Sequence, residues 1–279
     1  MGIGIPGRMD LRDIKSMIKH LDIKPRKKLS QVFLFHRGYL TRIARCASSY
    51  LATEGPVLEI GAGPGTLTLF LVRSGLRVIA IEIDERFAPI LTALCREFAM
   101  LDVVIADARY ALFSPNAPRN VVGNLPYHIS SELLLAMVRS GVKKALITLQ
   151  REVAERIIAK PGTSAYGRLS VIMQLSFNIK KLFDIPPRAF RPSPEVYSST
   201  VFMERIREYD ELMSVVENVT RCIFSYRNKV VDKVLRKCFP RAYGELSEAL
   251  REWLRARVFE LEPRVVMEIA RICVERKEC

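Results

Sequence analysis

The chain has 279 residues, of which 49% are apolar and 27% are charged. This composition excludes wholesale disorder, and the length is sufficient for one large domain or two ordinary ones. No apolar run is long enough to cross a membrane. The N-terminal residues lack the basic segment and apolar stretch of a signal peptide, so the cytoplasm is the expected location.

The formal net charge is +14, from 44 Lys and Arg against 30 Asp and Glu. An excess of this size favours a polyanionic partner, either a nucleic acid or an acidic membrane surface, although it also serves solubility. Residues 1–30 hold eight basic and three acidic residues, the highest density of net positive charge in the chain. We therefore expect an arm that contacts RNA through Lys24, Arg26, Lys27 and Lys28.

The six cysteines and three histidines give no metal-binding pattern. No Cys-x-x-Cys pair is present, and the histidines at positions 20, 36 and 128 are scattered. A zinc site is therefore not expected, and six reduced thiols are the simplest interpretation. The alternative is a disulfide, because the scarcity of glutamine is typical of thermophile proteins, in which intracellular disulfides occur.

The predicted elements begin with an amphipathic helix over residues 10–21, which places Leu11, Ile14, Ile18 and Leu21 on one stripe. After the basic arm, strand patterns alternate with helical ones. Strands are predicted at 57–61, 77–83, 102–107, 120–124 and 144–150, and helices at 66–74, 85–99, 130–139 and 151–159. Two further strand candidates, 170–185 and 199–206, flank a proline-rich stretch.

This alternation predicts an α/β fold with right-handed crossovers and a mostly parallel, doubly wound sheet. From about residue 205 the strand patterns end, and short amphipathic helical stretches follow. The expected organisation is an N-terminal helix and basic arm (1–30), a catalytic domain (31–204) and a small helical C-terminal domain (205–279).

Three glycines follow the first strand of the alternation and precede a helix, in the spacing Glu-x-Gly-x-Gly-x-Gly. Gly61 and Gly63 suit a turn whose backbone approaches a ligand closely. Glu82 ends the next strand, where a carboxylate can accept two ribose hydroxyls, and Asp107 ends the third, where it can accept from an adenine amino group. The pattern predicts an adenosine pocket. An NAD-dependent dehydrogenase is the competing class, but no hydride-transfer site can be identified.

The fourth strand ends at Asn124, and Leu125, Pro126 and Tyr127 follow it. The Asn124 side-chain oxygen and the Leu125 carbonyl can accept both hydrogens of an exocyclic amine, and Pro126 restricts the backbone so that this carbonyl projects. Tyr127 can stack on a heterocycle. Such a site activates an adenine N6 by position and electrostatics, without a strong base. A turn after a strand is the structural alternative. His128 is assigned no acid–base role.

At these residues the chain resembles the KsgA-type ribosomal RNA small-subunit adenine N6,N6-dimethyltransferases, in their archaeal or eukaryote-like form. The resemblance extends over nearly the whole length, and the matching segments are 27–34, 58–68, 80–84, 106–108, 123–130, 149–157, 166–171 and 190–199. It implies a Rossmann-like class I methyltransferase fold that uses S-adenosylmethionine.

The resemblance also implies roles for individual residues. Gln31 and Leu34 would close over the methionine end of the cofactor, Gly61 and Gly63 would line its amino-acid moiety, Glu82 would hold the ribose and Asp107 the adenine. Asn124 would lie between methyl donor and target amine, with Tyr127 and Phe190 on either side of the base. Phe190 as a core aromatic is the alternative.

The arm departs from the family pattern at two positions. Ser30 and Val32 stand where the family usually has Gly and Asn, so Val32 can contact the cofactor only through its backbone. A weaker cofactor affinity is a possible consequence.

The C-terminal region carries a second basic stripe at near-helical spacing, which suits salt-dependent contacts to phosphates. A solvated helix face explains it equally well from the residues alone, and the resemblance favours RNA. The stripe consists of Arg227, Lys229, Lys233, Arg236 and Lys237.

Together these features predict an enzyme that dimethylates N6 of two adjacent adenosines near the 3′ end of small-subunit rRNA during ribosome biogenesis. Its expected partner is the rRNA of a precursor small subunit, with no membrane and no metal, and the protein is expected to be a monomer. Two alternatives stay open: a large-subunit rRNA methyltransferase of the antibiotic-resistance type, and an RNA-binding assembly factor with dispensable catalysis.

Overall fold

The computed structural model describes residues 9–26, 29, 31–51 and 55–277. By its internal contacts the chain divides into two compact units, which are described separately. The first comprises Met1–Arg151 and Lys180–Glu204, and the second comprises Glu152–Ile179 and Arg205–Cys279. Residues 152–179 therefore belong to the same unit as the C-terminal helices. The sequence pattern instead placed them in the catalytic domain, over residues 31–204.

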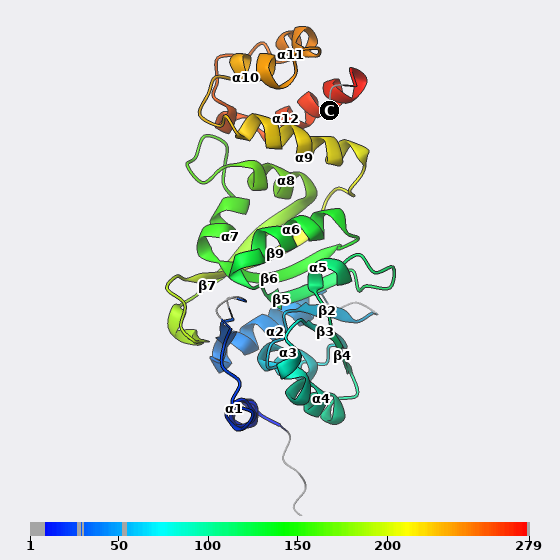
Figure 1. Cartoon of the computed structure of the whole chain (residues 1–279), viewed down its shortest axis with the longest axis vertical. Helices are drawn as coiled ribbons and strands as arrows, with labels where there is room; N and C mark the ends of the chain where they lie inside the picture. The colour runs from blue at the N-terminus through cyan, green and yellow to red at the C-terminus, as the bar shows by residue number, and fades with distance from the viewer. Residues whose placement is uncertain (1–8, 27–28, 30, 52–54, 278–279) are drawn as a thin grey trace, which may run out of the picture. The chain divides into compact units, whose positions relative to one another are not determined.

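The first unit is built on a seven-stranded sheet in the order β4-β3-β2-β5-β6-β9-β7 (Figure 1). The five strands from β4 to β6 are parallel, and β9 pairs antiparallel with β6. The bounds are β2 (Val57–Ile60), β3 (Val78–Glu82), β4 (Leu101–Ile105), β5 (Asn120–Asn124), β6 (Lys144–Gln150), β7 (Phe177–Ile185) and β9 (Ser198–Arg205). The sheet confirms the predicted α/β class with a mostly parallel sheet.

A separate two-stranded ribbon joins β1 (Phe33–Leu34) to β8 (Phe190–Arg191). The helices of this unit are α1 (Leu11–His20), α2 (Arg37–Leu51), α3 (Thr66–Arg73), α4 (Ala88–Glu97), α5 (Ala108–Ala111) and α6 (Ser130–Arg139). Three-residue 3-10 turns precede α4 (Glu85–Phe87) and α6 (Tyr127–Ile129). Every predicted strand between 57 and 150 is present; the bounds of β5 and β6 are as predicted, and those of β2, β3 and β4 differ by at most two residues.

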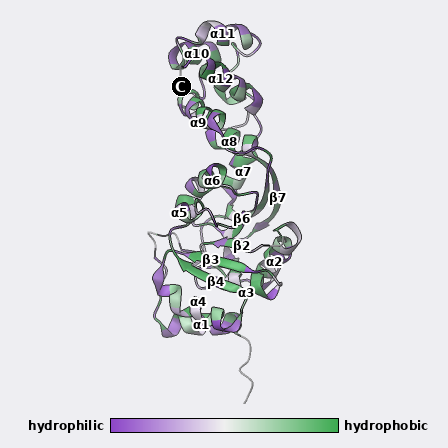
Figure 2. Cartoon of the chain, turned by 90° about the vertical axis from the view of Figure 1, so that its right-hand side faces the viewer, coloured by the Kyte–Doolittle hydropathy of each residue, from purple (hydrophilic) through white to green (hydrophobic). Residues whose placement is uncertain are grey.

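Burial on both faces explains the composition of the central strands. All four residues of β2 are buried, as are the five central residues of β6, which is the pattern of parallel strands covered by helices on both sides. Figure 2 shows hydrophobic colours along these strands, whereas the helices alternate between hydrophobic and hydrophilic residues around their axes.

The second unit is helical and has its own core. Its helices are α8 (Arg168–Ser176), α9 (Glu211–Phe224), α10 (Val231–Cys238), α11 (Tyr243–Ala249) and α12 (Pro263–Glu275), together with most of α7 (Arg151–Ile157) and a 3-10 turn at Val258–Glu260. Val216 and Val219 of α9 are fully buried in one cluster with Val266 and Ile269 of α12.

Two expectations for this region were wrong. Residues 168–176 form α8 rather than the first half of a strand, because Ser170 and Gln174 donate hydrogen bonds to backbone carbonyls at and after the end of α7. The expectation of six reduced thiols was also wrong, since Cys222 and Cys238 form a disulfide between α9 and α10.

Among the helices that the structure describes, none combines the length and apolarity that crossing a membrane requires.

Candidate active site

The glycine-rich turn connects β2 to α3 at the carboxyl end of the parallel strands. Gly61, Gly63 and Gly65 all have positive φ, at 70°, 55° and 81°. A Cβ on Gly63 would lie 2.9 Å from the Phe33 ring. Glycine is therefore required at this position both by the backbone conformation and by the ring packed against it.

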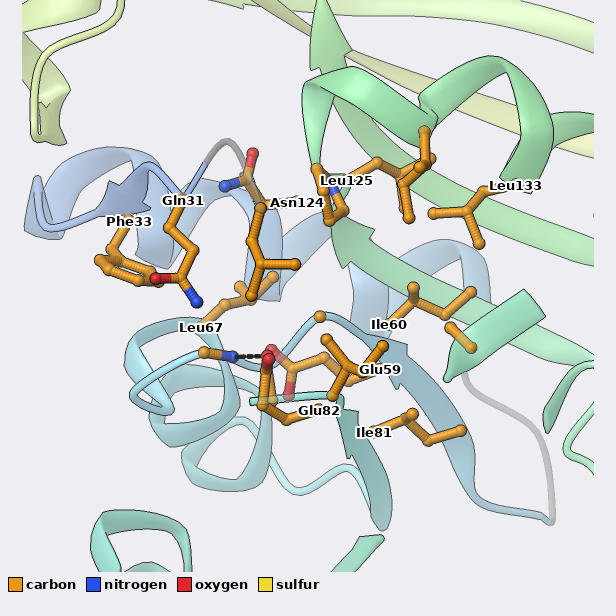
Figure 3. Close-up of a pocket in the computed structure, with 18 of the residues that line it drawn as sticks. Gln31, Phe33, Glu59, Ile60, Leu67, Ile81, Glu82, Asn124, Leu125 and Leu133 are labelled. Atoms are coloured by element: carbon orange, nitrogen blue, oxygen red, sulfur yellow. Dashed lines mark hydrogen bonds between the residues drawn. The ribbon is translucent and has the colours of Figure 1, made fainter. Parts of the chain in front are cut away.

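Glu82, at the end of β3, is buried beneath this turn. Its carboxylate accepts hydrogen bonds from the backbone amides of Gly63, at 2.7 Å, and Asp84, at 2.8 Å. Burial raises the pKa of Glu82, and the two amide donors oppose that rise. Figure 3 shows the bond at Glu82 and the carboxylate facing the cavity. Each oxygen keeps a lone pair that can accept a ligand hydroxyl.

Asp107 follows β4 and caps α5 by accepting from the amide of Arg109 at 2.9 Å. The Arg109 guanidinium also binds the Asp107 carboxylate in bidentate fashion, with a shortest distance of 2.6 Å, and reaches Glu132 at 3.1 Å. The Arg109 bonds lower the pKa of Asp107, which outweighs its partial burial. Asp107 thus lines the cavity as a carboxylate held in place by Arg109.

Asn124 ends β5 and presents an acceptor to the same cavity. Its Nδ2 donates to the Val32 carbonyl at 3.1 Å. Its Oδ1 is buried without a hydrogen-bond partner in the described part of the chain. A buried unpaired acceptor is costly unless a ligand supplies a donor. This oxygen is therefore positioned to accept from a bound molecule.

Leu125 and Pro126 line the cavity beside Asn124, whereas Tyr127 does not. The amide of Leu125 donates to the Thr148 carbonyl at 2.9 Å, which fixes the turn to β6. Tyr127 is half-buried, and its hydroxyl lies 2.6 Å from that of Ser198. Burial raises the pKa of Tyr127, so the phenol stays neutral.

Phe190 also lies outside the cavity lining. It is fully buried in the core of the first unit, on β8, where it pairs with Leu34 of β1. This placement matches the core-aromatic alternative, and the ring can stack on a base only if β8 shifts. Its stacking role stays a prediction.

The arm (residues 24–34) is attached to the loop after β3. Gln31 donates to Asp84 at 2.8 Å and accepts from the Arg26 amide at 2.8 Å, while Arg26 lies 3.6 Å from Asp84. Gln31, Val32 and Leu34 all line the cavity, as the resemblance implies. Lys24 is exposed and lies 3.5 Å from Asp22. Lys27, Lys28 and Ser30 fall outside the described residues.

Glu59 also lines the cavity, although the sequence pattern did not single it out. It lies in β2 with 1% of its surface exposed, and its Oε2 lacks a partner among the described groups. Burial raises its pKa to about 8, so it is protonated at neutral pH. The signal was its place as the first residue of the Glu-x-Gly-x-Gly-x-Gly pattern. A carboxylic acid in this state can donate a hydrogen bond as well as accept one.

These groups fit the expected cofactor. The cavity joins the glycine turn to the carboxyls of Glu59 and Glu82 and the free acceptor of Asn124, with Ile60, Ile81 and Leu133 as an apolar wall (Figure 3). Acceptors for ribose hydroxyls beside an apolar slot for a base suit an adenosine. In the described residues no cluster of three or more His, Cys, Asp or Glu could hold a metal ion.

Some side chains of the basic stripe in the second unit make contacts within that unit. Arg227 is half-buried and donates to the carbonyls of Ser164 and Tyr166 at 3.1 and 3.0 Å. Arg236 and Lys237 are exposed but lie over the rings of Tyr243 and Tyr226. The side chains of Lys229 and Lys233 are also exposed. Arg227 thus has a structural role that its spacing did not reveal.

Comparison with known proteins places these features in a family context. A family model described as ribosomal RNA adenine dimethylase matches residues 23–253. A ribosomal RNA small subunit methyltransferase A from Thermotoga maritima is 38% identical over 78% of this chain and 77% of its own. A probable ribosomal RNA small subunit methyltransferase A from Methanopyrus kandleri is 34% identical over 89% of this chain and 92% of its own.

Solved structures show the same fold. A dimethyladenosine transferase from Plasmodium falciparum superposes with a TM-score of 0.73 at 23% identity, covering 88% of this chain and 98% of that one. The 23S rRNA methyltransferase ErmE superposes with a TM-score of 0.65 at 26% identity, covering 86% of this chain and 98% of that one.

Proposed function

The chain belongs to the ribosomal RNA adenine dimethylase family, and from this membership we propose that it methylates N6 of two adjacent adenosines near the 3′ end of small-subunit rRNA. The methyl donor is S-adenosylmethionine, and the product at each position is N6,N6-dimethyladenosine. The observation that carries the proposal is the unpaired Oδ1 of Asn124 in a cavity that also holds Glu82 and Asp107.

When bound, the cofactor supplies a methyl group on a positively charged sulfur, which a nitrogen lone pair can attack. Asn124 Oδ1 accepts one N6 hydrogen of the target adenine, and the Leu125 carbonyl accepts the other. The bond from Asn124 Nδ2 to Val32 holds the amide in the orientation that exposes this oxygen. Both acceptors draw the amine toward tetrahedral geometry, which frees its lone pair for attack.

The remaining roles follow the family pattern. Glu82 holds the ribose, Asp107 the adenine, and Gly61 and Gly63 the amino-acid end, while Gln31, Val32 and Leu34 close the arm over it. Pro126 shapes the turn and Tyr127 flanks the target base, which Phe190 reaches from the other side once β8 shifts. After transfer the amine loses its proton to water, so a second methyl group can follow.

Two groups of residues would bind the RNA backbone. They are Lys24, Arg26, Lys27 and Lys28 in the arm, and Lys229, Lys233, Arg236 and Lys237 in the helical unit, whereas Arg227 is held by the carbonyls of Ser164 and Tyr166. We propose that the substrate is presented by a precursor small ribosomal subunit in the cytoplasm and that the enzyme acts as a monomer.

Small-subunit rRNA is favoured over large-subunit rRNA because the curated relatives named for the small subunit are 34% to 38% identical. An assembly factor with dispensable catalysis is less favoured, because the unpaired Asn124 acceptor has no evident structural purpose.

The test is to incubate the full chain with methyl-labelled S-adenosylmethionine and separately purified small or large subunits, and then map the label. Label at two neighbouring adenosines of small-subunit RNA supports the proposal. Label confined to large-subunit RNA overturns the substrate, and absence of label on both overturns the activity.

A further inference from the structure

A second cavity lies beside the proposed active site, and the proposed function does not use it. It has a volume of about 690 Å³ and is bounded by α1, the arm, the β1–β8 ribbon and the loop before β8. This volume lies within the range of roughly 300–1,000 Å³ that is typical of sites for small ligands. The cavity is therefore large enough for one nucleotide.

Positive charge surrounds this second cavity. Arg12 and Lys15 of α1 line it, as do Arg188, in the turn before β8, and Arg191 of β8. All four side chains are exposed, and no carboxylate is found among the described residues that line the cavity. Arg12 has a contact to Asp10 at 3.2 Å, but its side chain remains 92% exposed. The rim is thus suited to an anion.

The floor of the cavity is apolar and partly aromatic. Phe33 and Phe35 are half-buried there, and Phe87 packs edge-on against Phe33 with ring centroids 5.3 Å apart. Aromatic rings between cations are the combination on which unpaired nucleic-acid bases stack while their phosphates are held. An acidic peptide would satisfy the charges but would not need the rings.

Phe33 connects the second cavity to the proposed active site. Its ring lines both cavities and lies against Gly63 of the glycine turn. Phe33 is also paired in register with Arg191 across the β1–β8 ribbon. The two cavities therefore adjoin at Phe33.

We propose that this second cavity binds one unpaired nucleotide of the rRNA strand that carries the target adenosine. The base lies against Phe33 and Phe35, and the phosphate lies between the cations of α1 and Arg188 or Arg191. The inference rests on the proposed rRNA substrate and extends it, because it assigns a flanking position on the strand to a specific site. Such a site would select RNA whose target adenosine has an unpaired neighbour.

The first experiment compares the double variant Arg12→Gln/Lys15→Gln with the wild type in methyl transfer to small subunits at several salt concentrations. The control is Lys19→Gln/Arg96→Gln, which removes the same charge from exposed residues of α1 and α4 outside the cavity. We expect the KM for small subunits to rise about tenfold and the slope of log affinity against log salt to fall by about 0.7, the value for one lost single-strand phosphate contact.

The KM for S-adenosylmethionine should stay within twofold in both double variants, and the control should leave the KM for small subunits unchanged. Equal effects of the two double variants would overturn the site. Loss of affinity for intact subunits without loss for the isolated rRNA would also overturn it, because the cavity would then bind a ribosomal protein.

The second experiment tests for the base. Wild type and Phe35→Leu are cross-linked by ultraviolet light to small-subunit rRNA, and the joined peptides are sequenced. The proposal is supported if the wild type forms a cross-link between a nucleotide and Phe33 or Phe35, and if the yield of this cross-link falls at least fivefold in the variant. Absence of the cross-link in the wild type overturns the proposal.

The proposed substrate fails separately if the wild type methylates only large subunits. The same comparisons made with large-subunit RNA then still decide whether the cavity binds a nucleotide.

Discussion

The side-chain nitrogen of Gln31 lies 2.8 Å from a carboxylate oxygen of Asp84, which joins the arm to the loop after β3. Asp84 has no exposed side-chain surface and also accepts a bidentate bond from Arg86. The Arg86 bond, helped by Gln31, lowers the pKa of Asp84 to about 2. Asp84 thus stays charged in the folded protein at any pH above that value and holds the arm beside the cavity.

The first prediction is that Asp84→Asn weakens S-adenosylmethionine binding about tenfold, because the arm loses a charged anchor whose bonds contribute about 1.5–3 kcal/mol each. The rate at saturating cofactor should change less than the affinity. Calorimetric titration measures the affinity. Asp102→Asn, which removes an exposed carboxylate that pairs with Arg77, is the control. Unchanged affinity in Asp84→Asn would show that the anchor does not position the arm.

Lowering the pH should reduce the stability of the protein through the Asp84 carboxylate. The folded-state pKa of Asp84 is lower than its unfolded value of 3.8, so its stabilising contribution is complete above about pH 4. It is lost as the pH falls toward 2. The difference in unfolding free energy between wild type and Asp84→Asn should therefore shrink across this range in urea titrations. A constant difference would contradict the low pKa.

The second prediction is that Asn124→Ala lowers the turnover number about 10²- to 10³-fold, the usual cost of removing one aligned polar group from a transition state. Cofactor affinity should change far less, because Glu82 and the glycine turn remain. Single-turnover transfer to small subunits measures the rate. Asn116→Ala, an exposed asparagine of the same unit, should behave as the wild type. Retained activity in Asn124→Ala would refute its catalytic role.

The third prediction separates backbone strain from ligand contact. Gly63 and Gly75 both have positive φ, at 55° and 88°, but only a Cβ on Gly63 meets another group, the Phe33 ring. Alanine at either position should cost about 1–2 kcal/mol of stability through φ alone. Gly63→Ala should in addition lose cofactor affinity at least tenfold, whereas Gly75→Ala should keep it. Equal affinities in the two variants would argue against cofactor contact at Gly63.

The fourth prediction concerns Glu59, whose folded-state pKa of about 8 exceeds the unfolded value of 4.5. The unfolded chain releases this proton between these values while the folded chain keeps it, so the Glu59 contribution to stability falls as the pH rises from 4.5 to 8. Glu59→Gln removes the titration. The free energy of unfolding of the variant should therefore rise by a few kcal/mol relative to that of the wild type across this range. Denaturant unfolding without cofactor measures it. A pH-independent difference would contradict the raised pKa.

The alternation of strands and helices predicted the sheet well, because buried parallel strands leave long apolar runs that local patterning reveals. Glycines, acids and Asn124 were brought to one cavity as expected, since the carboxyl ends of parallel strands meet at one edge. Gln31 could be placed there only through the resemblance, because no periodicity relates it to Asp84, 53 residues later.

What the pattern could not predict depended on partners distant in sequence. The sequence favoured Phe190 as a stacking platform and kept a core position as the alternative, and in the structure Phe190 is buried and pairs with Leu34. The spacing of Arg227 suggests a phosphate ligand. In the structure it instead donates hydrogen bonds to the carbonyls of Ser164 and Tyr166, which lie more than 60 residues earlier in the chain. Hydrogen-bond partners of this kind leave no local signal.

The position of β9 between β6 and β7 has a consequence for how the protein is made. Strand β6 ends at Gln150, but its antiparallel neighbour begins only at Ser198. During translation, the nascent sheet therefore exposes the unpaired backbone of β6 while the ribosome adds almost fifty more residues. A chain that terminates in this interval would hold every residue of the glycine turn and of Asn124–Tyr127 and yet present an open sheet edge prone to aggregation.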